Sequence, residues 1–417
     1  MFRTLAILTA ALSLVTQMAA AQAGRRWVWT RDSVLTSDEV DYELTKNAGG
    51  RAVALARYMD GQEHKVWMTS MYAADEEEVR AFCYSNMGDR AGEAVVRTDG
   101  EENAVVAIAG TRKVAAWVED YQVWTASQAL DTVDGPWPRP TPHITGDNEC
   151  LSGHIALAAH GDDIVYIVYE EERYNHNDEY HLRFRKSADQ GLYWDTQVSV
   201  VEYTYPYGEI HWPSLAVHQT DMNVVYVAYH VVNPARTQDT VVFQRSNNGG
   251  TNWFGRTEIA TIPYAAGAGV CIAADRNRVV VFWSEMANGR YQVKYRTSTN
   301  SGSSFGAEQE LPLEEPWIYW DKKHPNAVFV SNDEGRLYLM LTTQGRDATR
   351  QPVRHGVGMI HGWWDGDNLR WDLPYWLNET LRPGGDEMLP SMHGCDFVTG
   401  DVARGSSHLC CRTRGVG

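Results

Sequence analysis

Histidine, arginine, acidic and tyrosine side chains stand in short polar loops beside apolar runs, where they could bind and cleave an anionic ligand. Arginines bind carboxylates through paired hydrogen bonds. Histidine, carboxylate and tyrosine groups can transfer protons or act as nucleophiles. The candidates for these catalytic steps are Asp75, Glu209, His211, Tyr319 and His324. The candidates for ligand binding are Arg51, Arg173, Arg236, Arg290, Arg346 and His154.

These candidates occupy two kinds of loop in a repeating pattern. One kind leads into the first apolar run of a repeat and holds Arg51, His154, Glu209, His211, Tyr319 and His324. The other kind follows the second run and holds Asp75, Arg173, Arg236, Arg290 and Arg346. If successive runs are antiparallel strands, both kinds of loop reach the same edge of a sheet. We therefore predict that the candidates gather at one rim.

The repeat is built from short apolar runs. Runs such as "DIVYIVY", "NVVYVAYH" and "RVVVFWS" recur about every 50 to 60 residues. A second run precedes each of them across polar turn residues, and a third and a fourth run follow. Four antiparallel strands at this period are typical of a propeller blade, which buries its faces only against neighbouring blades. The sequence thus predicts an all-β propeller.

An eight-residue motif, called the octet below, follows the third run in three repeats. It reads Ser-x-Asp/Asn-x-Gly-x-x-aromatic, with another aromatic residue three positions before Ser, and a weaker copy stands at residues 82–89. The Asp or Asn can cap its own turn, the Gly allows a positive φ, and the aromatic can pack between sheets. We predict structural roles for Ser187, Asp189, Gly191, Trp194, Ser246, Asn248, Gly250, Trp253, Ser298, Asn300, Gly302 and Phe305.

The composition suits an exported, acidic β protein. The chain has 417 residues, with 16 Trp, 21 Tyr, 35 Gly and a formal charge of −17. This charge argues against nucleic acid or an anionic membrane as a partner. Residues 1–21 combine Arg3, an apolar run and a small-residue cleavage pattern, which predicts a signal peptide rather than a membrane anchor. We expect an extracellular or periplasmic protein.

One domain is expected over residues 25–395, followed by a disordered tail over residues 396–417. The sequence has no H-x-x-H or H-E-x-x-H spacing, and its six cysteines form no C-x-x-C pair. Such local spacings are the usual sequence sign of a zinc site. The sequence therefore predicts no metal and no cofactor.

The octets resemble the Asp-box, or BNR, repeat of the sialidase (neuraminidase) superfamily, over roughly residues 45–345. The resemblance implies six blades, with seven possible, and octets on the face away from the active site. It also implies arginines that hold a carboxylate, an acid catalyst for which Asp75 is suitably placed, and a nucleophilic tyrosine. Arg51 lacks the Ile-Pro that follows the family's first arginine, and His324 stands near the tyrosine position.

Three functions follow from these residues, all with a glycan as the partner. The first is a sialidase-like glycoside hydrolase with an atypical catalytic set, acting on an acidic sugar. The second is a polysaccharide lyase in which an arginine neutralises a uronate carboxylate while a histidine and a tyrosine move protons. The third is a non-catalytic glycan-binding propeller. Whether the chain is an enzyme stays open at this point.

Overall fold

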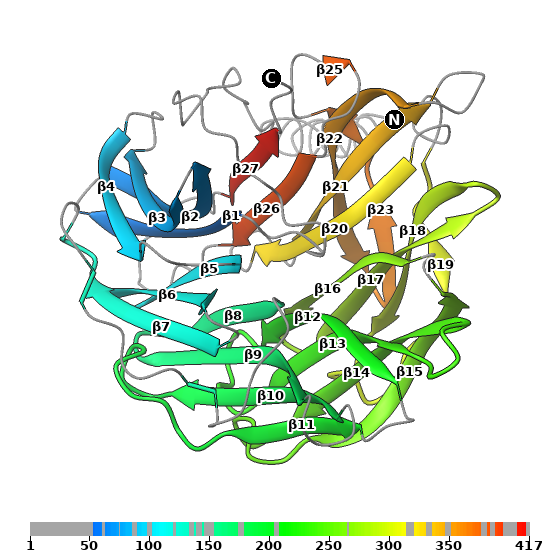
Figure 1. Cartoon of the computed structure of the whole chain (residues 1–417). Helices are drawn as coiled ribbons and strands as arrows, with labels where there is room; N and C mark the ends of the chain where they lie inside the picture. Colours follow the sequence, from blue (N-terminus) through cyan, green and yellow to red (C-terminus); the bar gives the residue numbers. More distant parts are fainter. Residues whose placement is uncertain are drawn as a thin grey trace, which may run out of the picture. The chain divides into compact units, whose positions relative to one another are not determined.

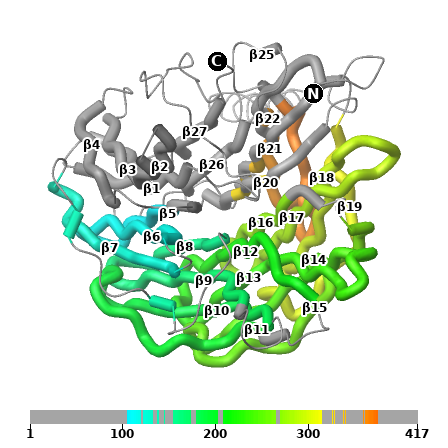
Figure 2. Tube along the Cα trace, in the orientation of Figure 1, coloured from blue at the N-terminus to red at the C-terminus, as the bar shows by residue number. Residues whose placement is uncertain are grey.

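The described part of this computed structural model consists of antiparallel β-sheets and contains no helix (Figure 1). The backbone is described for the strands and connected turns between residues 53 and 413. Side chains are described for most of residues 105–313, for residues 325, 327, 337, 339, 358 and 360, and for 361–374 (Figure 2). This part of the chain has no helix long and apolar enough to cross a membrane. The predicted signal peptide lies outside the described residues.

The strands of each sheet are consecutive in the sequence. The first two sheets comprise β1 (Val53–Asp60), β2 (Glu63–Ala74), β3 (Glu76–Ser85) and β4 (Arg90–Arg97), then β5 (Glu102–Ala109), β6 (Arg112–Glu119) and β7 (Gln122–Ala129). The next two comprise β8 (Ile155–His160), β9 (Ile164–Arg173), β10 (Glu179–Ser187) and β11 (Val198–Tyr203), then β12 (Glu209–Val217), β13 (Val225–Val232), β14 (Gln238–Ser246) and β15 (Phe254–Pro263).

Three further sheets follow. They comprise β16 (Gly267–Asp275), β17 (Arg278–Ala287), β18 (Arg290–Ser298) and β19 (Gln309–Glu310), then β20 (Asp321–Val330), β21 (Arg336–Arg346), β22 (Pro352–Asp365), β23 (Asn368–Trp371), β24 (Tyr375–Trp376) and β25 (Arg382–Pro383), and last β26 (Met388–Gly394) and β27 (Ser407–Thr413). Strand β27 falls within the predicted tail and pairs with β26. The domain boundaries stay a prediction.

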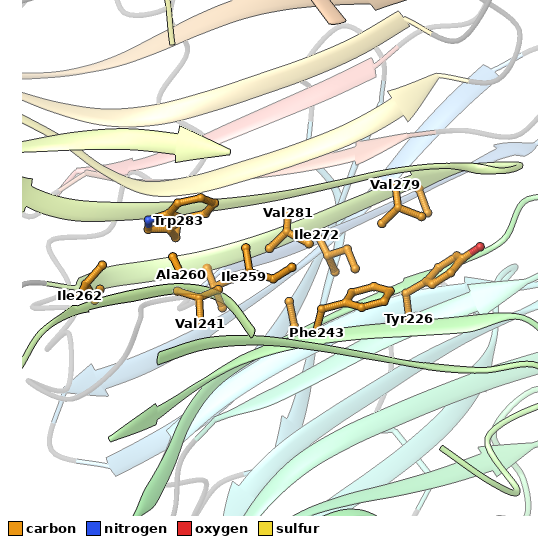
Figure 3. Packing of buried hydrophobic residues seen from close by; sticks show 13 residues of the cluster. Tyr226, Val241, Phe243, Ile259, Ala260, Ile262, Ile272, Val279, Val281 and Trp283 are labelled. Carbon is orange, nitrogen blue, oxygen red and sulfur yellow. The ribbon is translucent and has the colours of Figure 1, made fainter. Parts of the chain in front are cut away.

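The second strands β9, β13 and β17 are largely apolar, as expected where both faces of a strand are covered. In β13 every residue is buried, as expected for a strand packed between two neighbouring sheets. The first strands of successive sheets contact one another, from β5 to β8, β12, β16 and β20 (Figure 1). Figure 3 shows the core between the β12–β15 and β16–β19 sheets, where Phe243 and Tyr226 meet Val281 and Ile272.

Each octet forms a turn that closes on its own side chains. The Ser187 hydroxyl donates to Asp189 Oδ1 at 2.7 Å and accepts from the Gly191 amide at 2.8 Å. Asp189 Oδ1 also accepts from the Tyr193 amide at 2.9 Å. The Ser246 and Ser298 octets repeat these bonds with Asn248 and Asn300. Asp and Asn can alternate because the turn uses Oδ1 as an acceptor in each octet.

The octet also joins its sheet to the preceding one. Gly250 lies so close to the Phe184 ring that an added Cβ would stand 1.9 Å from a ring carbon. Trp253 packs edge-on against the same ring, with centroids 5.2 Å apart. Gly302 and Phe305 take the corresponding places on Phe243. The aromatic three positions before Ser in one repeat is therefore enclosed by the glycine and the last aromatic of the next octet.

The same interlock continues where the octet motif is absent. Tyr295, three positions before Ser298, contacts Trp371 of β23 edge-on at 5.4 Å, and the indole Nε1 donates to the Tyr295 hydroxyl at 2.9 Å. Trp371 follows a short turn between β22 and β23 instead of an octet. An aromatic residue is thus packed between neighbouring sheets even where the octet motif is absent.

These observations confirm the predicted all-β fold of antiparallel sheets for the described residues, and four of the seven sheets have four strands. The number of blades that would close a propeller ring stays a prediction. So does the count of six implied by the sialidase resemblance.

We predict that Gly250→Ala lowers the free energy of unfolding by about 3 kcal/mol or more, because the new methyl group would overlap the Phe184 ring. Gly161→Ala is the matched control. Gly161 also has a positive φ, of 60°, but no atom lies within 4 Å of the added Cβ, so only about 1 kcal/mol of backbone strain is expected. Urea unfolding of both variants measures the difference. Equal losses in the free energy of unfolding would contradict the tight contact between Gly250 and Phe184.

Candidate functional site

The first two strands of the β8–β11 sheet bring a histidine and a carboxylate together at the start of β8. His154 immediately precedes β8, and its carbonyl accepts a hydrogen bond from the Glu170 amide of β9 at 3.3 Å. Its ring Nδ1 lies 3.0 Å from Glu170 Oε2. Glu170 is buried and His154 is half-buried. The pair is therefore held by both backbone and side chain.

A second histidine and carboxylate begin β12, the first strand of the next sheet. His211 Nε2 lies 3.2 Å from Glu209 Oε2. Arg236, in the loop between β13 and β14, donates from Nε to Glu209 Oε1 at 2.9 Å. Both Glu209 oxygens are thus engaged by basic side chains, while the Arg236 side chain stays 60% exposed.

The charges of this group shift two pKa values. The hydrogen bond from His211 lowers the pKa of Glu209 to about 2, with burial opposing the shift and Arg236 adding to it. Burial opposes protonation of His211, but the bond to Glu209 and the negative charges of Glu170 and Asp239 outweigh it and raise the pKa of His211. Glu209 is consequently a carboxylate at neutral pH and not a proton donor.

A β-bulge places an indole among the histidines. His211 pairs with His230 of β13, and the register then shifts so that Ser214 pairs with Ala228. Within this bulge Trp212 has φ 57°, a left-handed conformation that costs a non-glycine residue on the order of 1 kcal/mol. The centroid of its ring lies 6.3 Å from the ring centroid of His154, 6.0 Å from that of His211 and 5.0 Å from that of His230. Bulges often reorient side chains beside active sites.

A buried pair supports the indole from the side of β13 and β14. His230 Nδ1 lies 2.8 Å from Asp239 Oδ2, and both residues are buried. Among the described residues, no hydrogen-bond partner reaches His230 Nε2, Asp239 Oδ1 or the buried Trp212 Nε1. Buried polar atoms without partners are uncommon away from functional sites or bound water.

The structure thus places several predicted residues near one another. His154, Glu209, His211 and Arg236 lie at the adjoining ends of the β8–β11 and β12–β15 sheets. Arg290 begins β18 at the corresponding turn of the next sheet. The side chains of Asp75, Tyr319, His324, Arg51, Arg173 and Arg346 lie outside the described residues.

Sequence reasoning missed the residues that complete the group. Glu170, Trp212, His230 and Asp239 were not among the candidates, although "DIVYIVYEEER" and "NVVYVAYH" each end an apolar run with a polar residue. The sequence did contain one sign of these residues, namely a polar residue at the end of an apolar run. Such a residue needs a hydrogen-bond partner if the strand is buried.

The cluster also contains donors of the kind that bind metals. One donor atom from each of His154, Glu170 and His211 lies within 4.8 Å of the others. Imidazole nitrogens with a carboxylate oxygen suit Zn²⁺ and similar divalent ions. Within the described residues these are the side chains that could hold such an ion.

Comparisons with solved structures identify the kind of fold. The chain is similar to the α-L-arabinanase of Penicillium chrysogenum solved with arabinobiose (TM-score 0.51, 13% identity, 76% of this chain and 94% of that chain). It is also similar to the polysaccharide lyase Uly1 (TM-score 0.51, 10% identity, 92% and 91%). A PL25 ulvan lyase is comparable (TM-score 0.50, 10% identity, 86% and 92%). No protein-family model and no curated protein sequence matches the chain.

These similar structures are β-propeller enzymes. At such low identities the likeness shows the fold of this chain and not its activity. Membership of the sialidase superfamily, inferred from the octets, stays a prediction.

We predict that Gly208→Ala disturbs the start of β12. Gly208 has φ 104°, and an added Cβ would lie 2.1 Å from the Val232 carbonyl oxygen, so the strand must move away from β13 and carry Glu209 with it. We expect a loss of about 2 kcal/mol or more in urea unfolding. The control is Gly366→Ala, where φ is 62° and no atom lies within 4 Å. A loss no larger than the control's would show that the start of β12 tolerates the methyl group.

Proposed function

We propose that this protein cleaves uronate-containing polysaccharides by β-elimination at the rim formed by β8, β12 and the β13–β14 loop. The observation that carries the proposal is a pair of imidazoles, His154 and His211, each bonded to its own carboxylate beside a fixed and exposed arginine. The similarity in fold to two polysaccharide lyases supports it as an analogy.

The reaction has three requirements. A cationic group must neutralise the uronate carboxylate so that the proton on C5 becomes acidic. A base must take that proton, and the electron pair left on C5 then forms the C4–C5 double bond as the C4–O bond breaks. An acid must protonate the departing oxygen. No water is consumed, and one product carries the unsaturated sugar.

Arg236 is the described residue placed to meet the first requirement. Glu209 fixes its guanidinium through Nε and Nη2, and the exposed remainder of the group faces solvent at the rim. A guanidinium binds a carboxylate with two parallel hydrogen bonds, which an ammonium group cannot do.

The two histidines meet the other requirements. The contact of His154 Nδ1 with Glu170 suits the tautomer that carries its proton on Nδ1 and its lone pair on Nε2, in the way a carboxylate orients a catalytic histidine. His211 belongs to the same cluster and is held by Glu209. We assign His154 as the base that takes the C5 proton and His211 as the group that protonates the leaving oxygen.

A glycosidase of the usual kind fits the described residues less well. It needs a carboxylic acid that protonates the glycosidic oxygen. Glu209 is bonded through one oxygen to His211 and through the other to Arg236. Glu170 is buried against His154. Glu209 is therefore the partner of two basic groups and not a proton donor, and Glu170 lies against an imidazole.

We predict ultraviolet-absorbing, unsaturated products when the purified protein is incubated with uronate polysaccharides. His154→Ala and His211→Ala should each lower the rate by about 10²- to 10⁴-fold, the usual contribution of acid–base catalysis. His160→Ala, at the other end of β8, is the control and should keep the rate. New reducing ends without ultraviolet absorbance would indicate hydrolysis, and binding without any products would indicate a non-catalytic propeller.

We also predict that Arg236→Ala weakens the binding of an oligouronate by about 1.5 to 3 kcal/mol, the scale of charge-assisted hydrogen bonds. Arg236→Lys should recover only part of this loss. Arg256→Ala, on the outer strand β15 where Arg256 pairs with Glu258, serves as the control. Calorimetric titration with acidic and neutral oligosaccharides measures the effect. Equal affinity for both sugars would remove the carboxylate-binding role.

A further inference from the structure

Three metal-binding side chains converge at the rim although they are far apart in the sequence. His154 precedes β8, Glu170 lies in β9 and His211 lies in β12. One donor atom of each lies within 4.8 Å of the others. Two of the residues are half-buried and Glu170 is buried. The set is thus preformed by strand pairing and by packing between two sheets.

The dimensions suit a transition metal. Zn²⁺ binds imidazole nitrogen and carboxylate oxygen at about 2.0 to 2.2 Å, so the donor atoms of one tetrahedral ion lie about 3.4 Å apart. Side-chain movements on the order of 1 Å would bring these three groups to that separation. Three protein ligands leave a fourth position open, as in catalytic zinc sites.

The surroundings supply the support that metal ligands require. Glu209 Oε2 contacts His211 Nε2, which leaves Nδ1 of the ring available to a metal, and Arg236 fixes Glu209 in turn. Such carboxylate–histidine contacts orient metal-binding imidazoles. The Trp212 indole packs against the rings of His154 and His211 and limits their movement.

We propose that His154, Glu170 and His211 form a three-ligand site for a divalent transition metal, best represented by Zn²⁺, and that the metal competes with the polysaccharide for the two imidazoles. The site itself does not depend on the proposed function. The competition does, since a metal bound to the imidazoles occupies the nitrogen lone pairs that proton transfer would use.

The expectation of no metal rested on local spacing. His154 and Glu170 belong to one sheet and His211 to the next, so no short motif such as H-x-x-H can reveal the set. The ligands lie on adjacent strands at the same rim, and only the fold brings them together.

Titration of the metal-free, full-length protein with ZnCl₂ by calorimetry tests the site. The wild type should bind one more Zn²⁺ than His154→Ala and His211→Ala do, or bind that ion at least tenfold more tightly. Glu209→Gln keeps all three ligands but removes the carboxylate that orients His211. It should lower the affinity for this Zn²⁺ ion by about 10- to 100-fold. His160→Ala should match the wild type. Cobalt substitution should add a tetrahedral visible spectrum in the wild type that both histidine variants lack.

Identical Zn²⁺ titrations of the wild type and both histidine variants, with thermal unfolding showing all of them folded, would overturn the metal site. The titration contains no polysaccharide, so this outcome leaves the lyase proposal standing. Conversely, Zn²⁺ binding at these residues without any turnover of uronates would remove the lyase proposal and leave the metal site. If turnover occurs and saturating Zn²⁺ does not slow it, the competition is wrong.

Discussion

The close approach of each octet glycine to a side chain of the preceding sheet, Val114, Phe184 or Phe243, is the contact on which the rest of the structure depends. A sheet of four strands cannot bury both faces alone, so neighbouring sheets must pack together. Gly250 on Phe184 and Gly302 on Phe243 fix how closely they pack, because a side chain at either glycine would overlap the ring. This separation brings the first strands β8, β12 and β16 beside one another.

The chemistry at the rim is a consequence of that packing. His154 comes from one sheet and His211 from the next, and the Trp212 ring contacts both. The bulge in β12 that turns Trp212 into this position costs backbone strain. The Trp212 ring also packs against the buried His230 of β13, which contacts Asp239 of β14.

The sequence revealed the features that arise within a few residues of each other. An octet bonds to itself, from Ser187 to Asp189 and Gly191, so its spacing is visible along the chain. His154, Glu209, His211 and Arg236 were found because the repeat shows which loops share a rim. Glu170 and His230 were missed because they lie within largely apolar strands, and the burial of Asp239 at the polar start of β14 becomes visible only in the fold. The left-handed Trp212 could not be foreseen, since only strand pairing imposes it. Trp371 takes the place of an octet aromatic although no octet precedes it. The packing between sheets therefore continues where the sequence no longer shows the motif.

Imidazole NMR signals, recorded while an oligouronate is added to the full-length protein, test most directly whether this rim is the glycan site. The chain offers internal references, because His160 ends β8 and His218 follows β12, at the ends opposite to His154 and His211. We predict that the His154 and His211 signals shift progressively with the sugar while those of His160 and His218 stay in place. Binding of the oligouronate with no change at His154 and His211 would contradict the assignment of the site.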